Sequence, residues 1–170
     1  MGRGGAAGKR GRQDEEGVGL AALRDLLYLV ALAWWTGTAA YFGGSATPSV
    51  FAHFARTEAG QIVEVLFPGY YRTALATGAV LVAMGAWRLA AGRPRARLAL
   101  ALAVVMLAMA LVGALLQPRI HALRVQAAEA GPDRPLPPAF GLLHGLSVVA
   151  SGVSVLAALA SWAIIATAGL

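Results

Sequence analysis

The sequence predicts an all-α membrane protein: a four-transmembrane-helix bundle with a short amphipathic helix between spans one and two. Apolar residues make up 58% of the 170-residue chain and charged residues only 13%, which is a composition typical of membrane proteins. Several runs are almost free of charge over about 20 residues, the length of helix that crosses a bilayer. Because a backbone in lipid must satisfy its own hydrogen bonds, each of these runs predicts a helix.

The first 22 residues are predicted to form a disordered basic tail on the cytoplasmic side. They are rich in glycine and charge and have no hydrophobic period, so they cannot bury enough apolar surface to become ordered. The four-helix transmembrane domain is then expected at residues 23–170, with spans at about 26–48, 68–90, 98–117 and 139–165.

A signal peptide is an alternative interpretation of span one, because TGTAA supplies small residues after a short apolar core. A span is favoured because the run stays apolar through YFGG. In addition, Thr36, Ala40 and Gly44 recur every four positions, which is the spacing of a helix-packing face.

The segment between spans one and two, PSVFAHFARTEAGQIVEVLFP, is predicted to be an interfacial amphipathic helix. Its apolar residues recur at roughly helical spacing, opposite a polar stripe that includes His53 and Glu64. Pro48 and Pro68 bound the segment, and Tyr70 follows at the depth where amphipathic rings gather.

The basic residues predict the orientation in the membrane. Nine of the 14 Lys and Arg residues lie before span one or between spans two and three: Arg3, Lys9, Arg10, Arg12, Arg24, Arg88, Arg93, Arg95 and Arg97. The other five are expected on the opposite side: Arg56, Arg72, Arg119, Arg124 and Arg134. The positive-inside rule therefore predicts that the N-terminus lies in the cytoplasm, and four spans return the C-terminus to the same side. The expected location is a bacterial cytoplasmic membrane. Since topology explains the net charge of +6, no nucleic-acid partner is expected.

Unusual polar residues gather where the outer ends of the spans meet. LLQPRIHALR follows an uncharged run and places Arg119 at the outer boundary, and the last span carries hydroxyl groups on one face below His144. Polar groups at membrane depth are costly and usually functional, so a site is expected here. The candidate ligand-binding residues are Glu64, Tyr70, Arg72, Arg119, His144, Ser147 and Ser151.

Three ordered motifs, LFPGYY, QPRIHALR and LLHGLS, resemble the transmembrane protein 205-like family, a domain of unknown function. The resemblance covers nearly all of the chain after the tail. One departure is Ser151, which stands where family members often have asparagine. The resemblance implies the four-span fold but no biochemical activity.

The leading hypothesis for function is a small-ligand or ion-binding polar site at the outer face of the bundle. A purely structural role for Arg119 and His144 stays open, as does an accessory subunit of a larger membrane complex or a homo-oligomer. The lipid bilayer is the one partner that the composition requires.

Haem or metal binding is a further alternative, with His53, His121 and His144 as candidate ligands. Their spacing matches no metal-site motif, and the absence of cysteine excludes thiolate ligands. No cofactor is therefore expected. Ser147 lies three residues after His144 without a visible oxyanion site, so no enzyme is expected either.

Overall fold

The computed structural model describes the backbone of residues 4–131 and 135–168. Throughout these ranges the elements are helical: α1 (Gly4–Tyr41), the π-helix η1 (Phe42–Ala46), α2 (Thr47–His53), α3 (Arg56–Ala90), α4 (Ala96–Glu129) and α5 (Pro138–Ala168). Four segments are long and apolar enough to cross a membrane: Gly17–His53, Arg56–Ala90, Ala96–Glu129 and Pro138–Thr167. The predicted all-α fold with four transmembrane helices is confirmed.

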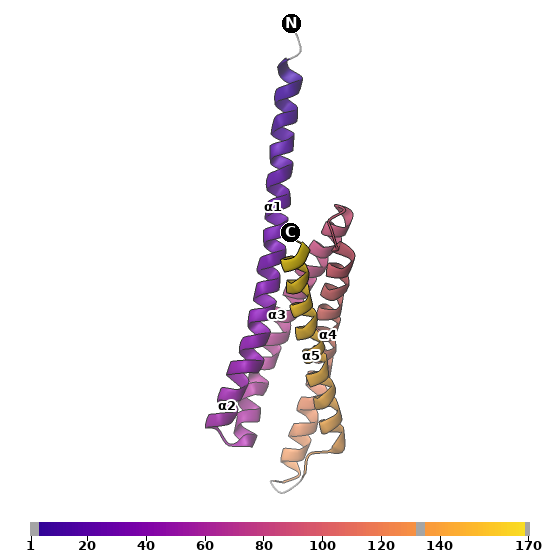
Figure 1. Ribbon diagram of the computed structural model, residues 1–170. Helices are drawn as coiled ribbons and strands as arrows, with labels where there is room; N and C mark the ends of the chain where they lie inside the picture. Colours follow the sequence, from indigo (N-terminus) through magenta and orange to yellow (C-terminus); the bar gives the residue numbers. More distant parts are fainter. Residues whose placement is uncertain (1–3, 132–134, 169–170) are drawn as a thin grey trace.

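The helices form an elongated bundle in which α3 packs between α1 and α4, and α4 packs against α5 (Figure 1). Its core is filled largely by small residues, with a few large side chains such as Tyr28, Leu81 and Met106. Small residues let membrane helices approach closely. At Gly85 of α3, for example, an added Cβ would lie 3.2 Å from the Leu100 backbone of α4.

The N-terminal part of α1 extends beyond the other helices (Figure 1). Its backbone is helical from Gly4, whereas the sequence predicts a disordered tail over residues 1–22. The disorder of this tail stays a prediction from its composition. Residues 1–3 of the predicted tail lie outside the described residues.

The segment between spans one and two also differs from the prediction. Helix α2 is short and continues directly from η1, and the chain then turns at Phe54. The remainder of the predicted amphipathic helix is the first part of α3, which passes through Pro68 without ending. Proline removes one donor, but long membrane helices tolerate it because the turns on either side remain bonded. Pro118 lies inside α4 in the same way.

Candidate functional site

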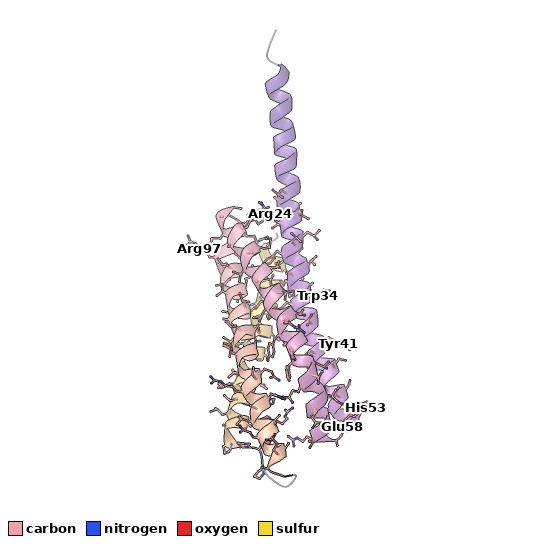
Figure 2. The ribbon with its side chains drawn as sticks, turned by 180° about the vertical axis from the view of Figure 1, so that it is seen from behind. Arg24, Trp34, Tyr41, His53, Glu58 and Arg97 are labelled. Carbon is pink, nitrogen blue, oxygen red and sulfur yellow. The ribbon has the colours of Figure 1, made fainter. Side chains whose placement is uncertain are left out.

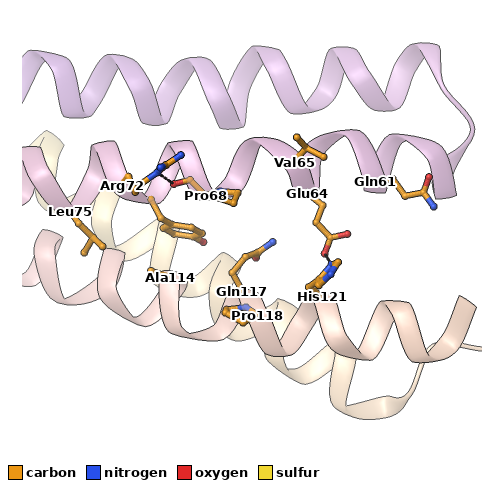
Figure 3. A pocket seen from close by; sticks show the side chains of 11 residues that line it. Gln61, Glu64, Val65, Pro68, Arg72, Leu75, Ala114, Gln117, Pro118 and His121 are labelled. Carbon is orange, nitrogen blue, oxygen red and sulfur yellow. Dashed lines mark hydrogen bonds and ion pairs between the residues drawn. The ribbon is translucent and has the colours of Figure 1, made fainter. Parts of the chain in front are cut away.

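A groove of about 810 Å³ lies between α3 and α4, toward the end of the bundle that carries α2 (Figure 3). Both helices contribute to its walls, and Glu64 of α3 and Gln117 and His121 of α4 point toward the opposite helix. The lining residues are Gln61, Glu64, Val65, Pro68, Tyr71, Arg72, Leu75, Ala114, Gln117, Pro118 and His121. Three polar members, Gln61, Glu64 and His121, lie at the end near α2, Arg72 and Gln117 lie between the two ends, and Leu75 and Ala114 lie at the opposite end.

A close contact between Tyr71 and Gly113 shapes the deeper part of the groove. Tyr71 of α3 is buried, and a Cβ added at Gly113 of α4 would lie 2.5 Å from its ring. Only glycine at this position leaves room for the ring. The aromatic side chain can therefore lie across the helix interface and form one wall of the groove.

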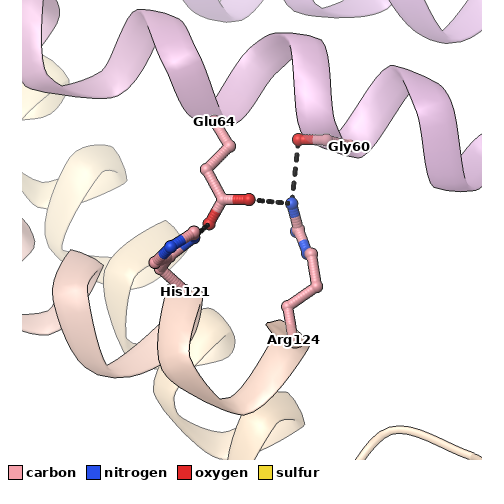
Figure 4. Close-up of polar contacts among 4 residues, drawn as sticks. All are labelled: Gly60, Glu64, His121 and Arg124. Atoms are coloured by element: carbon pink, nitrogen blue, oxygen red, sulfur yellow. Dashed lines mark hydrogen bonds and ion pairs between the residues drawn. The ribbon is translucent and has the colours of Figure 1, made fainter. Parts of the chain in front are cut away.

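The polar end of the groove holds a three-residue cluster that joins α3 to α4 (Figure 4). Glu64 contacts the Nδ1 atom of His121 at 2.6 Å through one oxygen and accepts a hydrogen bond of 3.2 Å from Arg124 through the other. An ionised carboxylate can only accept, so Nδ1 of His121 donates and its Nε2 stays available. The Glu64 side chain is 15% exposed and that of His121 is 57% exposed.

Arg124 is held by a second bond, which it donates to the carbonyl oxygen of Gly60 at 2.8 Å. Gly60 is buried, and an added Cβ would lie 3.2 Å from the guanidinium. A glycine at this position therefore lets the arginine reach the α3 backbone. Residues 60 and 64 are one turn apart, as are residues 121 and 124, so the helical period aligns both halves of the cluster.

Arg72 lines the groove but does not join this cluster. Its exposed guanidinium donates through Nε to the carbonyl oxygen of Pro68 at 3.2 Å (Figure 3). That is the one hydrogen bond of Arg72 within the described part of the chain. Tyr70 points elsewhere: its ring stacks on Phe42 of η1 at 4.6 Å and meets Tyr71 at 5.1 Å.

The structure does not join Arg119 and His144 directly. Both are exposed, Arg119 does not line the groove, and no hydrogen bond links the two among the described residues. His144 of α5 stacks on Phe140 with ring centroids 5.8 Å apart. The guanidinium of Arg124 lies 5.5 Å from the centre of the same Phe140 ring. Thus α5 reaches the polar cluster through the Phe140 ring, and His144 stacks on the same ring.

The predicted hydroxyl face of α5 is used within the bundle. Ser147 is buried and donates to the carbonyl oxygen of His144, and Ser151 donates to that of Ser147, both at 2.9 Å. Ser154 donates to the carbonyl oxygen of Met106 on α4 at 3.4 Å. These hydroxyl groups therefore satisfy backbone acceptors and pack α5, and they do not line the groove.

The three histidines are not brought together as a metal site. His53 is exposed on α2, where its Nδ1 lies 2.8 Å from the carbonyl oxygen of Ser49. His121 pairs with Glu64, and His144 lies beside Phe140. Among the described residues, no three His, Cys, Asp or Glu side chains form a group that could hold a metal ion.

A second polar cluster, which the sequence analysis missed, lies near the other end of the bundle. Asp25 of α1 accepts a bond of 2.5 Å from Arg88 at the end of α3 and one of 3.1 Å from Arg93 in the following loop. The side chains of Asp25 and Arg88 are only 11% and 5% exposed. Arg88 also lies 5.4 Å from the ring centre of Tyr28. The signal in the sequence is an acidic residue at the edge of span one, level with a basic loop.

Together the four apolar helices and their buried small residues define an integral membrane protein of the all-α class. The chain belongs to the family named Domain of unknown function (DUF4149), whose model matches residues 30–129. That match runs from α1 to the end of α4 and includes both walls of the groove. No enzyme family is indicated, and no curated protein or solved structure matches the chain.

Proposed function

We propose that this membrane protein binds a small ligand in the groove between α3 and α4. One observation carries the proposal: an open space of about 810 Å³ with Glu64, Arg72 and His121 on its walls. Ligand pockets are commonly spaces of about 300–1,000 Å³ with apolar walls and a few polar groups that fix orientation. The groove has this composition, and the proposed activity needs neither a catalytic step nor a resident cofactor.

The position of the groove relative to the bilayer supports the proposal. Arg24 and Arg97 lie toward one end of the bundle, and His53 and Glu58 lie at the other (Figure 2). A hydrocarbon core of about 30 Å accommodates about 20 helical residues. In α3, about 20 residues counted back from Arg88 end near Pro68. In α4, about 20 residues counted forward from Arg97 end near Pro118. Both groove prolines then lie at the membrane boundary, and the groove crosses it.

We propose that the groove faces the outer side of a bacterial cytoplasmic membrane and that both chain termini are cytoplasmic. The unequal distribution of Lys and Arg supports this orientation, because nine of the 14 precede span one or lie between spans two and three. Arg3 and Arg134, which belong to this count, lie outside the described residues.

We also propose that the resemblance to the transmembrane protein 205-like family reflects a shared site. LFPGYY contributes Pro68 and Tyr71 to the groove, and QPRIHALR contributes Gln117, Pro118 and His121. Two motifs that are far apart in the sequence thus line opposite walls of one space. The third motif, LLHGLS, lies beside Phe140 and reaches the polar cluster only through that ring.

An accessory or oligomeric role is a second candidate, favoured by the face of α1 and η1. Thr36 is used inside the bundle, where it accepts a hydrogen bond of 3.0 Å from Trp162. Ala40 and Gly44, one and two turns further along, are exposed. Small exposed residues in this register allow another membrane helix to pack closely.

Native mass spectrometry of protein released from membranes tests the binding function. Gln117→Trp fills the groove, and Leu115→Trp is its control, because Leu115 is 64% exposed and does not line the groove. We expect wild type and Leu115→Trp to retain a bound small molecule and Gln117→Trp to lose it. Equal adducts in all three proteins, or none in wild type, would contradict the proposal.

A further inference from the structure

We infer that the ligand is an anionic amphiphile, which places its alkyl chain between α3 and α4 and its phosphate or carboxylate headgroup against Arg72. The inference rests on the proposed function and names the class of ligand. Its basis is the order of groups along the groove, in which an apolar end, a guanidinium and a hydrogen-bonding end follow one another.

The apolar end lies on the membrane side of the two groove prolines. Tyr71 and Leu75 of α3 face Ala114 of α4 there. All of the residues that line the groove belong to α3 or α4, and α1 and α5 contribute none, so the groove opens sideways between α3 and α4. A groove that opens sideways at hydrocarbon depth meets lipid chains before it meets water. An alkyl chain can therefore enter it without leaving the apolar phase.

The charge in the groove selects an anionic headgroup. Both oxygens of Glu64 are engaged, by His121 and Arg124, so this carboxylate is already compensated. Arg72 uses only Nε within the described part of the chain, for the carbonyl oxygen of Pro68. The two outer nitrogens of the guanidinium are left to bind phosphate or carboxylate in a bidentate manner. Amide groups of Gln61 and Gln117 supply further donors.

Arg72 also lies at the correct depth for this role. It is one turn inside the level of Pro68, where the membrane boundary is expected. A guanidinium at this depth is costly unless it reaches water or a counter-charge. An anionic lipid headgroup provides this counter-charge at the depth of Arg72 while its alkyl chain enters the groove. A fully water-soluble anion has no alkyl chain to hold it at this depth.

Fluorescence quenching in vesicles tests the inference, because the chain has no cysteine and accepts a single labelled site. Ala114→Cys places a bimane probe in the groove, and Leu115→Cys places it on the exposed face at nearly the same depth. The quenchers are phosphatidylglycerol and phosphatidylcholine with the same doxyl-labelled chain. Each is added at the same low mole fraction to phosphatidylcholine vesicles.

We expect the anionic quencher to act more strongly than the zwitterionic one at position 114 and equally at position 115. Arg72→Gln should reduce the anionic preference by about tenfold or more, the ratio expected when a charge-assisted hydrogen bond is lost. Arg119→Gln is the matched control: this arginine is also exposed near the boundary but does not line the groove, so the preference should persist.

The other outcomes separate the inference from the proposed function. If both quenchers act equally at position 114 but more strongly than at position 115, the groove binds chains without headgroup selection and the inference is wrong. If inorganic phosphate alone changes the emission at position 114, the ligand is a small anion, and again only the inference is overturned. If positions 114 and 115 respond alike to every probe, both the inference and the proposed binding function are overturned.

Discussion

Replacement of Asp25 by asparagine should strongly destabilise the protein, because it removes the counter-charge of the buried Arg88. Asp25 compensates Arg88, whose side chain is 5% exposed and whose Nη1 atom lies 2.5 Å from the carboxylate. The Nε atom of Arg88 has no hydrogen-bond partner among the described residues. Without the carboxylate, the guanidinium keeps its charge, because arginine does not deprotonate in proteins.

The magnitude follows from the burial of the pair. Removal of one partner of a buried ion pair costs about 3–5 kcal/mol, because the other charge remains buried without compensation. The ring of Tyr28, 5.4 Å from the Arg88 guanidinium, is present in both proteins and does not change the difference. Asp25→Asn should therefore lower the free energy of unfolding by about 3–5 kcal/mol. Arg93→Gln is the control, since its side chain is 33% exposed and its pair with Asp25 is worth about 1 kcal/mol or less.

Reversible unfolding in mixed micelles, followed by far-UV circular dichroism, measures both changes. The double variant Asp25→Leu with Arg88→Leu should lose less stability than Asp25→Asn alone, because apolar residues leave no buried charge. The reasoning fails if Asp25→Asn loses as little stability as Arg93→Gln. It also fails if the double variant loses more stability than Asp25→Asn. Either result would show that the pair is not buried in the folded protein.

Three further predictions concern orientation, packing and the exposed arginine. A cysteine introduced at Gln61 should react with an impermeant maleimide in intact cells, and one at Arg95 only after the membrane is opened; the reverse pattern would invert the topology. Gly113→Ala should lower the free energy of unfolding by about 1–3 kcal/mol, because the added Cβ would lie 2.5 Å from the Tyr71 ring. Gly152→Ala is the control and should be neutral or stabilising, because an added Cβ there meets nothing within 4 Å. Equal melting temperatures of the two variants would contradict the contact between Gly113 and Tyr71. Arg119→Ala should change stability by less than about 1 kcal/mol in a thermal melt, because the side chain is exposed; a larger loss would show that it is held in the fold.

The fold follows from the sequence because it depends on length and composition. An uncharged run of about 20 residues has few alternatives in a bilayer, so the four spans could be predicted from local features alone. The helix ends could not be. Pro68 and Pro118 do not end their helices, and α3 and α4 continue past the expected boundaries. Proline is a weak signal for a helix end in membrane proteins, because transmembrane helices tolerate it within a span.

The depth of the candidate site along the bundle could be predicted from the sequence, but the side chains that contact each other there could not. Two of the candidate ligand-binding residues, Glu64 and Arg72, line the groove, and so does His121, which was a candidate metal ligand. That they bind a ligand stays a prediction. Which residues of span three face α3 depends on the rotation of α4, and residues 119 and 121 lie about 200° apart around a helix. Both faces carry polar residues, so the sequence does not decide between Arg119 and the face of His121 and Arg124. The contact of Asp25 with Arg88 depends in the same way on the rotation of two helices.

A crystal structure of the protein grown from a lipidic mesophase tests the central claim most directly, since it shows whether the groove between α3 and α4 is a binding site. We expect elongated density between Leu75 and Ala114, ending in a headgroup within hydrogen-bond distance of the Arg72 guanidinium, with Glu64 still bonded to His121 and Arg124. A groove closed by movement of α3 onto α4, or lipid density only on the outer surfaces of the bundle, would contradict it.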